Sequence, residues 1–199
     1  MRESGVGRVL VASLHQAIGD ILPTRLGFYE NWLTSDGLRD GTIGLPPLYA
    51  VLSFLRQEGP VCTEVTRTAG HYAAEWTAAS MSSFCRTSIS RLPRVIRERV
   101  VLGRAAALVR RSYDGSRASS RTRTGVARVT VRASVFCAVR EPVAHPLCVY
   151  YASACERMLA LFDINTSVTV ESCRGTGGDA CVLRVPFTRV EDAAPSETP

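Results

Sequence analysis

The chain has 199 residues, of which 46% are hydrophobic and 21% charged, and its formal net charge is +6. This composition is typical of one globular domain rather than of a disordered or fibrous chain, and at this length a second full domain is not expected. No apolar run approaches the roughly 18–20 residues of a membrane span. The short, interrupted apolar run of residues 6–14 is not expected to act as a secretory signal, so we expect a cytoplasmic protein with free thiols.

All 24 basic residues are arginine, and thirteen of them lie between residues 86 and 132, where only Glu98 and Asp114 oppose them. Clustered arginine can neutralise phosphates. Only Tyr113 is interleaved with these arginines, however, and no helix-turn-helix pattern surrounds them, so a nucleic-acid partner is not expected and a solvated helix face is favoured. A further interpretation places some of these arginines at the mouth of a ligand pocket, where a guanidinium holds a carboxylate.

The first two thirds of the chain predict helices. Apolar residues recur at steps of three and four, and proline or glycine marks the ends of the segments. The expected helices cover approximately residues 6–22, 28–34, 46–58, 63–79 and 94–111. Residues 112–125 contain almost no apolar side chain and predict a loop.

The last third of the chain predicts strands and one helix. From Val126 to Cys137 the apolar period changes to two, which indicates a half-buried strand. A helical pattern over residues 146–162 follows, and then two short strands, 168–173 and 181–185, flank a glycine turn. We therefore predict an α+β fold, an antiparallel β-sheet packed against an N-terminal helical layer, in a single ligand-binding domain over residues 1–190. Its helical part is 1–111, its sheet-containing part is 126–187, and a disordered tail follows at 191–199.

The order helix, strand, glycine turn, strand in this last third, with Cys173 and Cys181 facing each other across the turn, resembles the C-terminal signature of the 4-vinyl-reductase-type domain. That family includes bacteriochlorophyll 4-vinyl reductase-like proteins and sensor modules of aromatic-responsive regulators, and it shares its fold with the TRAPP vesicle-tethering subunits. The resemblance covers residues 129–185 and extends more weakly back to Gly70. Residues 1–60 cannot be placed by motif.

The resemblance implies an apolar ligand pocket between sheet and helices and a dimer formed through the N-terminal helices. The pocket is expected to be lined by large side chains in the corresponding elements, Trp76, Phe84, Phe136, Tyr150 and Tyr151, with the alternative that all five simply fill the core. The homodimer is also suggested by the apolar side chains between residues 26 and 55, which one small sheet is not expected to cover: Phe28, Tyr29, Trp32, Leu33, Leu48, Leu52 and Phe54.

The hairpin cysteines admit two interpretations. Free cysteines are usually small buried hydrophobic residues, and this interpretation, with no bound metal, is favoured. The alternative is structural zinc, because some sensor members of the family bind zinc with two similarly spaced cysteines, a nearby acid and an upstream cysteine. The zinc ligands would come from Cys148, Cys155, Glu171, Cys173 and Cys181, since positions 148 and 155 share one helical face.

The function favoured by these patterns is non-catalytic binding of a hydrophobic or aromatic small molecule, such as a tetrapyrrole, by a carrier, accessory factor or sensor. The sequence has no cofactor fingerprint and no acid–base pair, so an enzyme is not favoured. Its three histidines, His15, His71 and His145, have neither metal nor triad spacing. The alternative function is a TRAPP-like protein–protein interaction or assembly module, in which a protein partner fills the groove.

Overall fold

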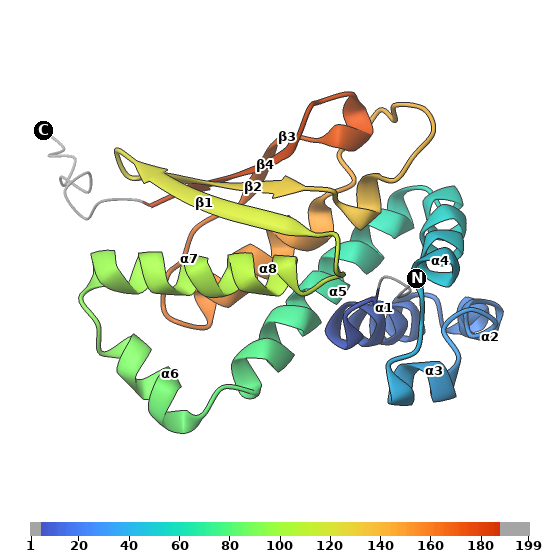
Figure 1. Ribbon diagram of the computed structural model, residues 1–199, viewed down its shortest axis with the longest axis horizontal. Coiled ribbons are helices and arrows are strands. Elements are labelled where there is room, and N and C mark those ends of the chain that lie inside the picture. Colours follow the sequence, from blue (N-terminus) through green and yellow to red (C-terminus); the bar gives the residue numbers. More distant parts are fainter. Residues whose placement is uncertain (1–4, 188–199) are drawn as a thin grey trace, which may run out of the picture.

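A four-stranded antiparallel sheet lies along one side of a helical layer in the computed structural model, which describes residues 5–187 (Figure 1). This architecture confirms the predicted α+β class. The strands are β1 (Arg117–Arg123), β2 (Val126–Arg132), β3 (Thr169–Ser172) and β4 (Cys181–Pro186), in the spatial order β1-β2-β4-β3.

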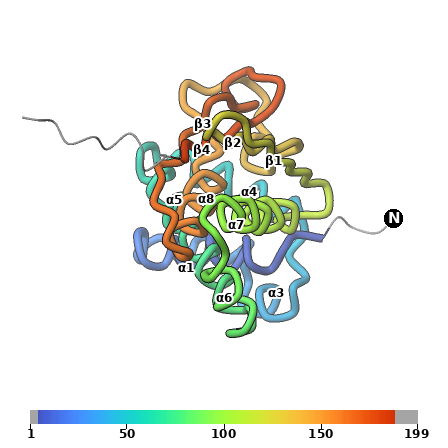
Figure 2. The backbone as a smooth tube through the Cα atoms, turned by 90° about the vertical axis from the view of Figure 1, so that its left-hand side faces the viewer, coloured from blue at the N-terminus to red at the C-terminus, as the bar shows by residue number. Residues whose placement is uncertain are grey.

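Side-chain alternation on the two central strands gives the sheet one buried face. On β2 and β4 the buried residues pair across the ladder, with Val129 opposite Leu183 and Val131 opposite Cys181. Helices α7 (Arg94–Arg110) and α8 (Val149–Ala160) pack beneath this face, and the two perpendicular views show the helices gathered on one side of the sheet (Figures 1 and 2). The core therefore lies between the sheet and the helical layer.

The remaining helices build the other part of that layer. They are α1 (Arg8–Ile21), α2 (Leu26–Tyr29), α3 (Ser35–Asp40), α4 (Leu45–Gln57), α5 (Pro60–Ala79) and α6 (Ser83–Ser90). Proline in the first turn starts both α4 and α5, where its missing N–H costs no helical hydrogen bond. Helix α5 is the centre of the layer, because it packs against both α1 and α8.

The crossing of α5 and α8 depends on Gly70. A Cβ at this position would lie 2.1 Å from Ser153 Oγ and 2.4 Å from the Tyr150 carbonyl oxygen. The two helices therefore approach more closely than any other residue at position 70 allows, and this contact fixes the start of α8 relative to α5.

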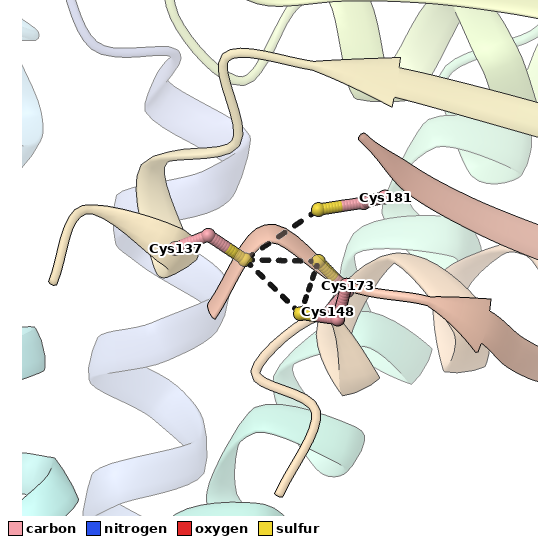
Figure 3. A group of neighbouring side chains, drawn as sticks. All are labelled: Cys137, Cys148, Cys173 and Cys181. Atoms are coloured by element: carbon pink, nitrogen blue, oxygen red, sulfur yellow. Dashed lines mark hydrogen bonds between the residues drawn. The ribbon is translucent and has the colours of Figure 1, made fainter. Parts of the chain in front are cut away.

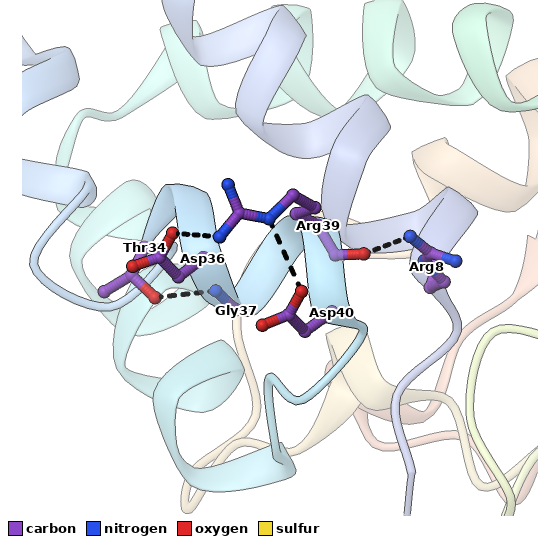
Figure 4. A network of polar contacts seen from close by, with 6 residues as sticks. All are labelled: Arg8, Thr34, Asp36, Gly37, Arg39 and Asp40. Atoms are coloured by element: carbon purple, nitrogen blue, oxygen red, sulfur yellow. Dashed lines mark hydrogen bonds and ion pairs between the residues drawn. The ribbon is translucent and has the colours of Figure 1, made fainter.

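A polar network joins the beginning of α1 to the short helix α3 (Figure 4). The Thr34 hydroxyl caps α3 by accepting from the Gly37 amide at 3.2 Å, and Arg39 pairs with Asp36 at 2.6 Å. Arg8 donates to the Arg39 carbonyl oxygen. These contacts hold a segment whose few apolar residues gave no helical signal in the sequence.

Two predictions about the segment before α8 were wrong. Residues 117–123 form strand β1 rather than a loop, because an edge strand needs only the backbone hydrogen bonds that β2 supplies and can be polar on both faces. The strand from Val126 ends at Arg132 rather than Cys137. Ala133 takes a φ of 55°, which interrupts the ladder, and Val135–Cys137 form a turn of 3₁₀ helix.

The apolar residues expected to form a dimer interface are largely covered within one chain. Tyr29, Leu33, Leu48 and Leu52 are buried, whereas Phe28 is 41% exposed and contacts the Trp32 and Phe54 rings. The homodimer stays a prediction, resting on a smaller patch than the sequence indicated. The expected tail at 191–199 lies outside the described residues. Within residues 5–187 no helix has both the length and the apolar character needed to cross a membrane.

Candidate functional site

Four buried cysteines converge at the end of the sheet nearest the start of α8 (Figure 3). The sulfur of Cys137 lies 3.2 Å from that of Cys148, 3.4 Å from that of Cys173 and 3.5 Å from that of Cys181. The Cys148 and Cys173 sulfurs are 3.7 Å apart, and all four atoms lie within 4.8 Å of one another. We call these four residues the tetrathiol cluster.

Each cysteine of the cluster sits at the end of an element. Cys137 closes the 3₁₀ turn after β2, and Cys148 is the residue before α8. Cys173 follows β3, and Cys181 is the first residue of β4. The sheet and α8 thus bring together thiols that are separated by up to 44 positions in the sequence.

The spacing of the cluster suits one tetrahedral metal ion. Four sulfurs each about 2.3 Å from a zinc ion are about 3.8 Å apart. The Cys137 sulfur lies 3.2 to 3.5 Å from the other three and the Cys148–Cys173 separation is 3.7 Å, which is just below that value, and no pair exceeds 4.8 Å. A multi-iron cluster needs a wider cage. A buried set of four protein ligands leaves no open coordination position, which is the arrangement of structural rather than catalytic zinc.

Hydrogen bonds within the cluster distribute protons unequally among the thiols. A hydrogen bond with Cys148 lowers the pKa of Cys137 to about 7, and one with Cys137 lowers the pKa of Cys173. The hydrogen bond with Cys137 raises the pKa of both Cys148 and Cys181. A bound cation would supply the positive charge that lets the remaining thiols ionise.

Backbone amides support two of the sulfurs. The Leu147 N–H donates to Cys173 Sγ at 3.4 Å, and the Arg174 N–H donates to Cys181 Sγ at 3.5 Å. Such outer contacts orient thiolate ligands and stabilise their charge.

Two residues of the predicted zinc set lie elsewhere. Cys155 is buried on α8, where burial raises its pKa to about 12, and it is not in the cluster. Cys148 is the residue before α8, and its sulfur lies in the cluster, whereas the sulfur of Cys155, on the helix itself, does not. Glu171 pairs with Arg128 through two contacts of 2.7 and 3.0 Å, because a register shift between Val170 and Ser172 ends the alternation that would align it with Cys173.

Cys137 is the member of the cluster that sequence reasoning missed. We expected it at the end of a long strand, on the apolar face. The available signal was that four cysteines of the last third, leaving out Cys155, fall at element ends where the chain turns.

A cavity with a mostly apolar lining lies beside the cluster. It has a volume of about 880 Å³ and is bounded by the start of α5, α8, strand β3 and the loop before α8. Its apolar wall includes Val143, Leu147, Val149, Ala152, Val168 and Val170, and its polar groups include Arg56, Arg67, His145 and Glu156. We call it the main cavity. A pocket of this size and lining is typical of small-molecule sites.

None of the five aromatic residues predicted for a pocket lines the main cavity. Phe136, Tyr150 and Tyr151 form a buried aromatic group with ring centroids 4.9 to 5.4 Å apart. Trp76 stacks on Tyr72 and, with Tyr150, lines a smaller cavity of about 350 Å³ between α1, α5 and α7. Phe84 is 83% exposed on α6.

The fold and these features define an α+β domain with a closed tetrathiol cluster next to a half-open apolar cavity. By structure the chain is similar to an H-NOX protein from S. oneidensis, solved in the Fe(II)NO ligation state, with a TM-score of 0.55 and 12% identity over 92% of this chain and 99% of that one. At this identity the similarity shows the fold alone. No protein-family model matches the chain, and no curated protein matches it by sequence.

The residues present do not fit an iron group held by a buried histidine. All three histidines lie in the described part of the chain, and each is at least partly exposed. His15 contacts Glu30 at 3.1 Å, His71 is on α5, and His145 is exposed at the main cavity.

Proposed function

We propose that the chain is a non-catalytic small-molecule-binding module, of the carrier or sensor kind, whose ligand occupies the main cavity. The observation that carries this proposal is the cavity itself: about 880 Å³ with an aliphatic wall and a few separated polar groups. Sites that hold small molecules combine these features, since the apolar wall supplies affinity and the few polar groups supply orientation.

The same proposal assigns one zinc ion to the tetrathiol cluster as a structural centre. Support comes from the four converging sulfurs, their burial and the two amide donors. Zinc there would join the end of β2, the start of α8 and the β3–β4 connection. Cys137, Cys148, Cys173 and Cys181 are its proposed ligands, in place of the set containing Cys155 and Glu171.

One loop connects the two features. Residues 143–147 line the main cavity, while the Leu147 amide donates to Cys173 and the Val143 amide donates to the Gly175 carbonyl oxygen at 2.7 Å. Leu147 also packs on Gly175, where an added Cβ would lie 3.0 Å from its Cδ1. A metal in the cluster would therefore hold one wall of the cavity in place.

Membership of the 4-vinyl-reductase-type family, and with it a role in bacteriochlorophyll biosynthesis or aromatic sensing, is proposed from the sequence resemblance. The small-molecule site and the thiol cluster support it. They do not depend on it, because both are defined by residues of this chain.

Native mass spectrometry of protein purified without an affinity metal tests both parts of the proposal. We expect one zinc per chain and a non-covalent small-molecule adduct that is released on denaturation. Thr63→Trp places an indole at the cavity from the exposed side of α5, and it should remove the adduct while the zinc remains. Glu64→Trp is the matched control, because position 64 is exposed on the same helix and outside the cavity lining.

Retention of the same adduct by the Thr63→Trp variant would place the ligand outside the main cavity. Iron in place of zinc would contradict the metal assignment and leave the cavity proposal standing. The zinc content and the ligand adduct therefore test the metal site and the main cavity independently.

A further inference from the structure

The main cavity contains a cation that has no ion-pair partner among residues 5–187. Arg56, in the last turn of α4, is half-buried and lines the main cavity where it continues into a smaller cavity of about 20 Å³. No carboxylate of residues 5–187 lies within 4.0 Å of its guanidinium. Five other arginines do have such partners, at 2.6 to 3.2 Å: Arg25, Arg39, Arg94, Arg128 and Arg157.

The acidic groups near Arg56 are already engaged. Glu58, two residues further along the chain, pairs with Arg25 at 3.2 Å. Glu156, the carboxylate in the cavity lining, accepts from the Val168 amide at 2.7 Å. Arg67 adds a second cation to the lining, also without an ion pair to any described residue. The cavity therefore offers positive charge beside an aliphatic wall.

Partial burial costs the Arg56 guanidinium some of its hydration, and no carboxylate of the described residues offsets that cost. Desolvation lowers the pKa of Arg56, and the thiols of Cys62 and Cys137 oppose that shift. A guanidinium that is partly removed from water is stabilised best by a carboxylate that accepts two parallel hydrogen bonds.

We infer that Arg56 is the anion-binding residue of the main cavity, and that the cavity takes an amphipathic monocarboxylate whose apolar part lies against Val149 and Val170. This inference rests on the proposed function, because it names the ligand class of the same cavity. The arginines between residues 86 and 132 are not the ones involved, since none of them lines the main cavity.

A neutral ligand would show the opposite preference. An apolar cavity without a cation binds a fatty alcohol better than the fatty acid of equal length, because burying a carboxylate costs its hydration. With Arg56 engaged, the acid should be favoured instead.

The test measures displacement of anilinonaphthalene sulfonate by decanoate, decanol and decyltrimethylammonium, with 1-naphthoate as an aromatic acid. We expect wild-type protein to bind decanoate at least about tenfold more tightly than decanol. Arg56→Gln should weaken decanoate binding by about tenfold to a hundredfold and change decanol binding by less than about twofold. Arg56→Lys should recover part of the loss, because lysine keeps the positive charge but cannot donate two parallel hydrogen bonds to the carboxylate. Arg99→Gln, on an exposed position of α7, should change neither.

The outcomes separate this inference from the function on which it rests. If decanol and decanoate bind equally and Thr63→Trp blocks both, the cavity binds small molecules and the role of Arg56 is overturned. If Arg56→Gln lowers the zinc content and leaves decanoate binding unchanged, Arg56 stabilises the thiolates of the cluster electrostatically, and the inference is likewise overturned. If Thr63→Trp affects neither ligand, the proposed cavity function itself fails. Preference for 1-naphthoate over decanoate would retain the anion site and assign it to aromatic acids.

Discussion

The tetrathiol cluster and the main cavity lie on two sides of the same loop, and they differ in how far the protein satisfies its own groups. In the cluster every sulfur has neighbouring thiols, and two of the sulfurs also accept from backbone amides. In the cavity Arg56 faces an aliphatic wall with no carboxylate within ion-pair distance among the described residues. A closed set of ligands suits a permanent structural centre, whereas an open site with an unpaired charge suits a ligand that enters and leaves.

The loop of residues 143–147 connects the two sites, because it lines the main cavity and also contacts Cys173 and Gly175. A change confined to the cluster should lose metal first and loosen the cavity as a consequence. A change at the helix crossing that positions Cys148 should weaken both sites together, and a change at a nearby surface ion pair should weaken neither.

The largest expected effect follows removal of a cluster thiol. Cys173→Ser or Cys137→Ser should reduce zinc from about one per chain to nearly none. Either change should lower the free energy of unfolding by about 4 kcal/mol or more, because structural metal binding is expressed as folding energy. Elemental analysis and thermal unfolding measure the two quantities, and the unfolding midpoint should fall by about 10 °C.

Cys155→Ser is the matched control for those two variants. It removes a buried thiol outside the cluster, so it should cost about 1–3 kcal/mol through a poorly satisfied hydroxyl and keep the zinc. If all three variants lose the same free energy of unfolding and the wild-type protein holds no metal, the four cysteines of the cluster are packed side chains and not zinc ligands.

The next largest effect is expected at the α5–α8 crossing. Gly70→Ala places a methyl group 2.1 Å from Ser153 Oγ and 2.4 Å from a carbonyl oxygen, so the helices must separate. We expect a loss of about 2–3 kcal/mol in the free energy of unfolding, with weaker zinc retention and weaker ligand binding. Urea unfolding and zinc competition by a chelator measure these changes.

Gly103→Ala provides the comparison for that variant. Gly103 is exposed in the middle of α7 with no atom within 4 Å of an added Cβ, so alanine should stabilise the helix by up to about 1 kcal/mol. An unchanged stability of Gly70→Ala would show that the crossing is looser than described.

The smallest effect concerns Glu171, which the sequence offered as a zinc ligand. Hydrogen bonds from Arg128 lower the pKa of Glu171 below its ordinary value of 4.5, so the ion pair contributes to stability above that pH. This contribution is lost as the pH falls from 4.5 through the lowered pKa. Glu171→Gln should therefore keep full zinc content at neutral pH and show less acid dependence of unfolding than wild type. Loss of zinc in this variant would restore Glu171 to the ligand set.

The sequence alone determined the elements whose signals are local. Apolar residues at helical spacing indicated α1, α4, α5 and α7, and alternation with a glycine turn indicated the β3–β4 hairpin. Each of these patterns reports which side chains a single element buries. Edge strand β1 escaped prediction because its residues bury almost nothing, and its hydrogen bonds come from β2.

Only the tertiary structure decided which residues meet. Cys137 joins the cluster because Ala133 turns the chain at the end of β2, and Cys155 lies outside it, buried on α8. Arg56 gave no signal as a binding residue, since its significance lies in having no carboxylate within ion-pair distance in the part of the chain that the structure describes. Such convergence depends on where elements end and how they pack, which the periodicity within one element does not encode.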